Sequence, residues 1–356
     1  MNRAEAKQKA QALVAQMDVL EAAAQLSYDA PALDRLHIPE YNWWNEALHG
    51  VARAGVATSF PQAIAMAASF DQDEVQHLGE IASTEGRAKY NALSQKGDRD
   101  IYKGLTFWSP NINIFRDPRW GRGHETYGED PYLTTQLGLS YIRGLQGQGE
   151  YLKAAACAKH FAVHSGPEAE RHHFDVHPSK KDMAETYLPA FEAAVKEGHV
   201  ESVMGAYNAV NGYPCCGSPE LLQNYLRDNW GFEGHVVSDC WAIRDFHENH
   251  HFTDPPAESS AAALKAGTDL NCGCTYRCLL TALAQKLISE ADIRQAAVRL
   301  FTTRYLLGIM DGQHTEFDNI PYSKVECKAH TDYAIQAAEK GIVLLKNNGI
   351  LPLCKE

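Results

Sequence analysis

Charged side chains follow directly on short apolar segments of this sequence, and one of them could act as a nucleophile. Asp239 ends the segment VVSD, Lys159 and His160 end the segment AKH, and Arg122 lies in the charged loop FRDPRWGRGHETYGED. Neighbouring cations keep a carboxylate ionised, and they also donate hydrogen bonds to neutral hydroxyl groups. These residue types predict a site for a polyol, with Asp239 as the candidate nucleophile.

A fourth apolar segment, MGAYN, ends in the same way and adds Met204, Tyr207 and Asn208. In an α/β barrel the carboxyl ends of the strands face the active-site mouth, so residues at strand ends from distant parts of the chain come together there. We therefore expect these side chains to surround Asp239.

Each candidate also has a purely structural interpretation. An aspartate after a strand is often a helix N-cap, and Lys159 with His160 could be a surface ion pair beside a core histidine. Four tryptophans are by default packing residues, although aromatic faces also stack on sugars. They are Trp43, Trp44, Trp108 and Trp120.

Clustered histidines raise the alternative of a metal-dependent barrel hydrolase, because imidazoles at short spacing are common zinc ligands. The cluster consists of His160, His164, His172, His173 and His177. It lacks the H-E-x-x-H pattern and contains competing Lys and Arg residues, so the sequence favours no bound metal and no cofactor. The C-x-C-x-x-x-C pattern from Cys272 to Cys278 lacks a second cysteine pair and indicates buried thiols.

Strand-like segments alternate with helical patterns, which is typical of βα units around a parallel sheet. The strand candidates begin at Thr106 (TFWSPNINIF), Ala154 (AAACAKHFAV), Glu201 (ESVMGAYN) and Gly234 (GHVVSD). The intervening helices are predicted over 71–93, 131–145, 179–197 and 218–229. The predicted class is α/β.

After the last strand-like piece, KAGTDLNC, the pattern predicts helices over 274–286 and 289–307 and a looser stretch around 312–323. A further helix leads to the apolar run GIVLLKNNGILPL, which has the turn chemistry of Asn-Asn-Gly. We expect a barrel domain over residues 1–310, a linker and helix over 311–339, and the beginning of an incomplete second α/β domain over 340–356.

Composition excludes several classes of protein. The 356 residues carry 33 Lys and Arg against 45 Asp and Glu, a formal charge of −12, which gives no basic surface for nucleic acid. The N-terminal segment reads as an amphipathic helix rather than a secretory signal, and no stretch is apolar enough to act as a membrane anchor. Nine cysteines, an odd number, favour free thiols in a reducing cytoplasm. The sequence is compatible with an oligomer.

Seven longer segments, in order between residues 41 and 243, resemble glycoside hydrolase family 3, particularly its bacterial β-xylosidase and β-glucosidase members. The segments are YNWWNEALHGVARAG, FPQAIAMAASFD, FWSPNINIFRDPRWGRGHETYGEDPYL, AKHFAVHSGPEAERHHFD, ETYLPAFEAAVKEG, ESVMGAYNAVNGYPCC and GFEGHVVSDCWAI. The resemblance implies a (β/α)8-like TIM barrel and an exo-acting, retaining β-glycosidase that hydrolyses terminal non-reducing sugars of oligosaccharides or glycosides. The NWW and RHHF strings look more like xylosidase members and favour a pentose.

In the mechanism that the resemblance implies, Asp239 forms a covalent glycosyl-enzyme that water then hydrolyses. The resemblance also implies a set of residues that hold the sugar ring in the first subsite. The set consists of Glu46, Arg122, Lys159, His160, Arg171 and Tyr207, with Met204 packed nearby.

The chain departs from the family pattern because a retaining glycosidase needs a second carboxyl group as general acid and base. Two-domain members carry it as a Glu in the domain after the barrel. The expected sources are a C-terminal domain or a separate chain, and the alternative is a catalytically incomplete, sugar-binding remnant.

Single-domain members that act on β-N-acetylhexosaminides place a His with an acidic neighbour on the loop after the KHF strand. Here His172 or His173, with Glu170 or Asp175, is the corresponding but less favoured candidate for a general acid.

Overall fold

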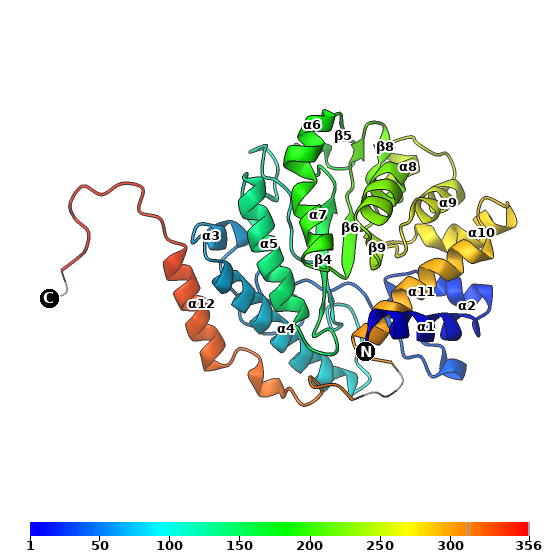
Figure 1. The fold of residues 1–356 in the computed structure, drawn as a ribbon, viewed down its shortest axis with the longest axis horizontal. Helices are drawn as coiled ribbons and strands as arrows, with labels where there is room; N and C mark the ends of the chain where they lie inside the picture. Colours follow the sequence, from blue (N-terminus) through cyan, green and yellow to red (C-terminus); the bar gives the residue numbers. More distant parts are fainter. Residues whose placement is uncertain (311, 313, 355–356) are drawn as a thin grey trace.

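A parallel sheet forms the centre of the molecule. The computed structural model describes residues 1–310, 312 and 314–354. Its central strands run parallel in the order β3-β4-β6-β9 (Figure 1). They are β3 (Thr106–Phe107), β4 (Ala155–Phe161), β6 (Ser202–Gly205) and β9 (His235–Ser238). The α/β class predicted from the alternating pattern is confirmed.

Isolated bridges continue this sheet at both edges. Asn45 pairs with Phe107 beside β3, and Leu270 pairs with Val237 beside β9, both in parallel. Two smaller sheets complete the β-structure: β1 with β2, and β5, β7 and β8. Their strands are β1 (Asp29–Ala30), β2 (Tyr41–Asn42), β5 (Asp175–Val176), β7 (Ala209–Val210) and β8 (Tyr213–Pro214).

Helices surround the sheet, and the ends of several are fixed by side-chain caps. Asp71 and Asp130 accept hydrogen bonds from backbone N–H groups of the first turns of α4 and α5, and Ser289 and Asp292 form a capping box at α11. The α-helices are α1 (Arg3–Val14), α2 (Val19–Ala24), α3 (Ala63–Ala67), α4 (Gln72–Ser94), α5 (Pro131–Gln146), α6 (Lys180–Asp182), α7 (Pro189–Lys196), α8 (Asp245–Glu248), α9 (Pro256–Ala266), α10 (Leu279–Ala284), α11 (Glu290–Leu306) and α12 (Lys328–Lys340).

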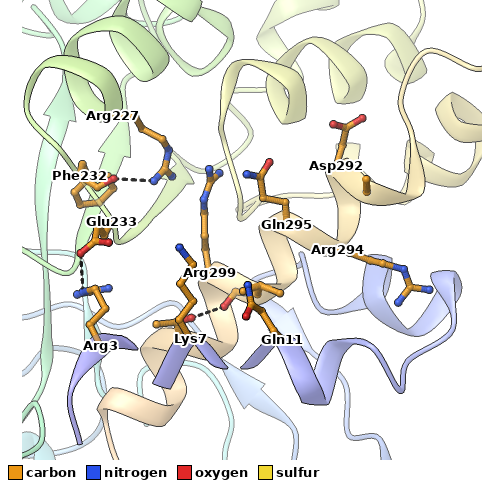
Figure 2. Close-up of a pocket in the computed structure, with 13 residues that line it drawn as sticks. Arg3, Lys7, Gln11, Arg227, Phe232, Glu233, Asp292, Arg294, Gln295 and Arg299 are labelled. Carbon is orange, nitrogen blue, oxygen red and sulfur yellow. Dashed lines mark hydrogen bonds and ion pairs between the residues drawn. The ribbon is translucent and has the colours of Figure 1, made fainter. Parts of the chain in front are cut away.

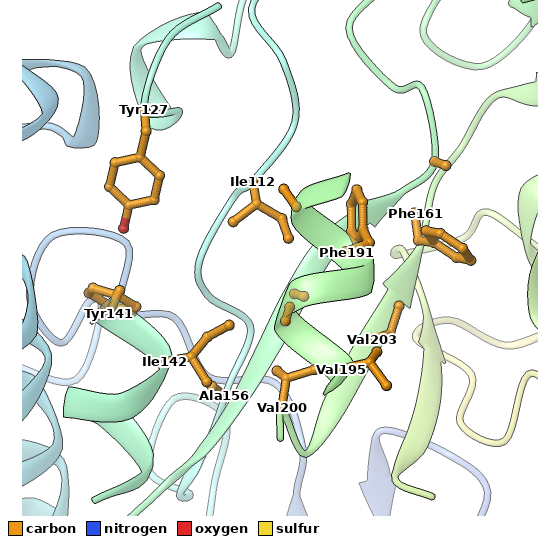
Figure 3. Close-up of a cluster of buried hydrophobic side chains, with 14 of the residues drawn as sticks. Ile112, Tyr127, Tyr141, Ile142, Ala156, Phe161, Phe191, Val195, Val200 and Val203 are labelled. Carbon is orange, nitrogen blue, oxygen red and sulfur yellow. The ribbon is translucent and has the colours of Figure 1, made fainter. Parts of the chain in front are cut away.

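Apolar side chains fill the space between the sheet and helices α5 and α7. Figure 3 shows Ile142 of α5 and Phe191 of α7 beside Phe161 of β4 and Val203 of β6. All four are almost completely buried. Burial of such side chains on both faces explains why the strands read as continuous apolar runs rather than as alternating patterns.

Three predicted elements differ in part from the structure. The strand expected over 106–115 is regular only at Thr106–Phe107. Pro110 has no N–H to donate and interrupts it, although a parallel bridge from Asn111 to Lys159 keeps the following residues beside β4. The helix expected over 179–197 is interrupted: α6 leads into the π-helical turn η4 (Met183–Tyr187), and α7 starts afresh at Pro189. Proline cannot continue a helix from the preceding turn. The segment 218–229 is helical, but as the π-helix η6 (Glu220–Asn229).

The C-terminal helix α12 lies outside α3 and α4, and the segment after it runs away from the body of the molecule (Figure 1). A buried carboxylate holds this helix in place: Glu85 of α4 accepts hydrogen bonds from Nδ1 of His330 and from the backbone N–H of Glu326. Most apolar side chains of residues 342–353 are exposed. The domain boundaries at 310 and 339 stay a prediction.

Within the described residues no helix combines the length and the apolar character needed to cross a bilayer.

The expectation that all cysteines are free thiols is wrong, because Cys240 and Cys272 form a disulfide. The other seven are free. The bond joins the residue after Asp239 to the neighbouring segment 270–272, two chain segments that the sequence does not show to be adjacent. A thiol titration of the denatured protein without reductant is expected to give seven free thiols, and nine after reduction.

For a bond between residues 32 positions apart, the Cys272→Ser variant should lose about 2–4 kcal/mol of unfolding free energy. A chemical denaturation curve measures this loss, and nine free thiols without reductant would contradict the disulfide.

Candidate active site

Asp239 directly follows β9, and its two carboxylate oxygens have different surroundings. Oδ1 accepts a hydrogen bond from the backbone N–H of Cys240 at 2.8 Å. Oδ2 is buried without a hydrogen-bond partner. The next helix, α8, begins only at Asp245 with Arg244 as its N-cap, so Asp239 does not cap a helix. Its free oxygen is therefore available for chemistry.

Arg122 reaches the site from the loop before the 3-10 turn η2 (Gly123–Glu125). Its Nε and Nη2 donate to the carboxylate of Glu125, and its Nη1 donates to Nε2 of His160 at 3.0 Å. Burial would raise the pKa of Glu125, but the hydrogen bonds and charge of Arg122 more than offset this and lower it. Glu125 therefore remains ionised and fixes the guanidinium plane.

The hydrogen bonds of Asn113 determine the protonation of His160. Nδ2 of Asn113 donates to the carbonyl of His160, so Oδ1 is the acceptor for both the backbone N–H and Nδ1 of His160. The proton lies on Nδ1, and Nε2 accepts from Arg122. Burial, together with Arg122, lowers the pKa of His160 well below its usual value. The contact of 3.5 Å between His160 Nε2 and Asp239 Oδ2 thus joins a neutral ring and a carboxylate.

Lys159 is buried beside β6 and is paired with a carboxylate. Its Nζ lies 3.2 Å from Oε2 of Glu46, and its backbone is in register with Met204 of β6. It is therefore not a surface lysine. Burial raises the pKa of Asp239, while the charges of Arg122 and Lys159 and the N–H of Cys240 oppose this rise. The ionised form of Asp239 depends on these two cations.

Tyr207 is buried within reach of the charge of Asp239. The guanidinium group of Arg171 lies over its ring at 5.9 Å, and the ring of His172 meets it edge-on at 4.6 Å. Burial and the charge of Asp239 raise the pKa of Tyr207. Arg171 is also paired with Glu168. Arg122, Lys159, His160 and Tyr207 thus all interact with the carboxylate of Asp239.

The five histidines do not form one cluster. His160 and His164 each place a ring nitrogen so that these atoms and a carboxylate oxygen of Asp239 all lie within 4.8 Å of one another. His172 instead pairs through Nδ1 with Asp245 at 2.7 Å. His177 pairs with Asp175, so His172 is bound to Asp245 rather than to Asp175 in the less favoured dyad.

Aromatic side chains line one side of the mouth. Trp44 stacks on Trp108 with ring centres 5.6 Å apart and meets Trp241 edge-on at 6.3 Å. A cavity of about 250 Å³ beside them is lined in part by Glu46 and Arg122. Trp43, Trp108 and Trp120 are buried, whereas Trp44 keeps partial exposure.

A larger cavity, about 750 Å³, lies elsewhere, between α1, α11 and the loop before β9 (Figure 2). Its arginines are already paired: Arg227 and Arg299 both contact the buried carboxylate of Asp269, and Arg3 contacts Glu201. Its lining comes from α1, α11 and the loop before β9, whereas Asp239 directly follows β9, and no predicted site residue lines it. These ion pairs hold α1 and α11 to the sheet.

Several residues that shape the site were not among the predicted ones. Asn113 orients His160 and Glu125 orients Arg122, whereas Asn208, which was expected near Asp239, contacts His164. The N-x-N spacing of Asn111 and Asn113 could have indicated them, because alternate residues of an extended segment point to the same side.

Residues 12–304 match the family model described as "Glycosyl hydrolase family 3 N terminal domain", and the chain belongs to this family. The chain is 46% identical to a xylan 1,4-beta-xylosidase of Xylanibacter ruminicola, over 98% of this chain and 42% of that protein. It is 42% identical to the probable beta-D-xylosidase 7 of Arabidopsis thaliana, over 98% and 48% of the two chains. The resemblance inferred from the sequence is confirmed.

Solved structures agree with this assignment. A glycoside hydrolase family 3 exo-beta-xylosidase, solved with a xylobiose aziridine probe, superposes with a TM-score of 0.93 at 37% identity and covers 99% of this chain and 47% of its own. A beta-glucosidase of Listeria innocua in complex with glucose gives 0.83 at 25% identity, with 98% and 53% covered. The chain spans less than half the length of the two curated relatives.

Proposed function

We propose that this chain carries the sugar-binding and nucleophilic half of an exo-acting, retaining β-glycosidase of the β-xylosidase or β-glucosidase type. The observation that carries the proposal is the unpaired Oδ2 of Asp239, held among Arg122, Lys159 and His160. Attack of Oδ2 on the anomeric carbon breaks the bond to the glycosidic oxygen, which departs with the leaving group, and forms the glycosyl-enzyme. The neighbouring anion also stabilises the positive charge that develops on the ring carbon and ring oxygen in the transition state.

The remaining predicted residues would hold the hydroxyl groups of one terminal sugar. Arg122, Lys159, Arg171 and Tyr207 offer hydrogen-bond donors, whereas Glu46 accepts; Met204 packs beneath. A pentose is the first choice of substrate, since the similar proteins named above include xylosidases. A glucoside differs by one hydroxymethyl group, which changes affinity by only about 1–3 kcal/mol, so dual activity fits the same site.

A (β/α)8-like barrel is part of the proposal. The sheet bridges from Asn45 to Phe107 and from Val237 to Leu270 support it, and a further bridge from Ser27 to Asn271 extends the latter edge. Hydrogen bonds from Trp43 to Tyr28 and from Tyr28 to Asn271 link the two edges.

The general acid and base is proposed to come from a C-terminal domain or a separate chain. A general acid needs a raised pKa. Among the described carboxylates near Asp239, Glu125 has a lowered pKa because of Arg122, and Glu46 is paired with Lys159.

The test is incubation of the full chain with a 2-fluoro-β-xyloside that carries an activated leaving group. Such a leaving group needs no protonation, so the first step proceeds without a general acid. A single mass adduct on Asp239, found by peptide mapping, is expected. Absence of any adduct from this reagent and from the matching 2-fluoro-glucoside would contradict the proposal.

A further inference from the structure

His164 lies just after β4, and the mechanism above assigns it no task. The side chain is buried between the rings of His160, at 4.6 Å, and Trp120, at 5.8 Å. Its Nε2 is buried without a hydrogen-bond partner. A buried polar atom without a partner costs about 1–3 kcal/mol, so a missing partner at this position needs an explanation.

The hydrogen bonds of Asn208 determine which nitrogen of His164 carries the proton. Nδ2 of Asn208 donates to the carbonyl groups of Ala162 and Ala209, so its Oδ1 is an acceptor. Nδ1 of His164 lies 3.2 Å from this Oδ1 and must donate to it. Nε2 therefore bears a lone pair. Burial, reinforced by Arg122, lowers the pKa of His164 to about 3, so the ring stays neutral.

The missing partner must be a donor, and the His164 ring lies beside Asp239, because one of its nitrogens belongs to the group of ligand atoms within 4.8 Å of one another. A divalent cation could also bind such a group, but Arg122 already donates to Nε2 of His160, and Lys159 adds a second positive charge. Repulsion from both cations disfavours a metal ion. A neutral O–H donor meets no such repulsion.

We propose that Nε2 of His164 accepts a hydrogen bond from the 2-hydroxyl group of the bound sugar. Asp239 bonds to the anomeric carbon in the proposed function, on which this inference rests. One ring neighbour of that carbon is an oxygen without a proton, and the other is the carbon that bears the 2-hydroxyl. This hydroxyl is therefore the donor nearest to the nucleophile, and His164 is a substrate-binding residue that distinguishes sugars at that position.

The test is a double-mutant cycle between His164 and the substrate. The full chain and its His164→Phe variant are compared on activated aryl β-xylosides that carry a 2-hydroxyl or are 2-deoxy. The variant is expected to lose about tenfold or more in kcat/KM on the 2-hydroxyl substrate, but little on the 2-deoxy substrate. His164→Gln, which offers an amide oxygen near the position of Nε2, should restore part of the loss.

His235 provides the matched control, because it is also buried, donates through Nδ1 to Thr303 and has an unpaired Nε2. It lies at the other end of β9. The His235→Phe variant should affect both substrates equally, and thermal unfolding monitors the fold of every variant.

The assignment is overturned if the His164→Phe variant loses as much on the 2-deoxy as on the 2-hydroxyl substrate, or if its loss disappears only on the 3-deoxy or the 4-deoxy xyloside, while Asp239 is still labelled. Stoichiometric metal in the purified protein would overturn it as well. No reaction of the unaltered chain with any of these substrates would instead refute the proposed function.

Discussion

Replacing Asp239 with alanine is expected to abolish the covalent adduct and to lower kcat/KM for an activated aryl xyloside by more than about 10⁴-fold. The reason is that Oδ2 of Asp239 is the unpaired carboxylate oxygen next to Arg122 and His160, and a methyl group cannot attack carbon. Mass spectrometry after incubation with the 2-fluoro-xyloside measures the adduct, and release of the aryl group measures kcat/KM.

A small external anion should partly rescue this variant. Azide can occupy the space that the carboxylate leaves and attack the same carbon, which yields a glycosyl azide of the opposite anomeric configuration to the substrate. The Asp254→Asn variant, which alters an exposed carboxylate, serves as the control and should label normally. Adduct formation in the alanine variant would place the nucleophile on another residue.

Replacing Lys159 with methionine is expected to lower kcat/KM by about a hundredfold at neutral pH and to shift the acid limb of the pH profile to higher pH. Burial raises the pKa of Asp239, and the positive charges of Arg122 and Lys159 oppose that rise. Without Lys159 the pKa rises further, and the unpaired Glu46 adds to the rise. Only the carboxylate form attacks, so a higher pH is needed to reach the plateau.

The rate of labelling by the 2-fluoro-xyloside, measured across pH, separates the two effects of this change. The shift of the acid limb reports the pKa of Asp239, and the deficit on the plateau reports the lost sugar contact. Lys103→Met is the matched control, since Lys103 also forms an ion pair, with Asp98, away from the site. An unshifted limb with a reduced plateau would show that Lys159 does not act on Asp239 electrostatically.

The sequence predicted the part of the site that depends on strand ends. Asp239, Lys159 and His160 directly end or follow strands, and parallel strands in register must bring such residues to one edge. Apolar runs followed by polar residues carry this information locally. Local signals also indicate α4 and α5. Their capping aspartates, and Pro131 in α5, stand in the sequence at the helix starts.

The sequence did not predict the contacts that depend on distant loops. Nothing in the order of residues places Cys272 beside Cys240, or Asp245 beside His172, because each pair is joined only when two strand-to-helix connections fold over the same edge. The chemistry of proline predicts the interruption at Pro189, but the apolar pattern continues across it and by itself predicts one helix.

The amide side chains of Asn113 and Asn208 have a consequence for the conditions under which the protein can work. Free imidazoles change charge between pH 5 and 8. Here each imidazole donates its Nδ1 proton to a fixed amide oxygen, and burial beside Arg122 keeps both rings uncharged. Mild acidification therefore does not protonate these two rings. Any loss of activity in mild acid comes from protonation of the carboxylates in the Asp239 site.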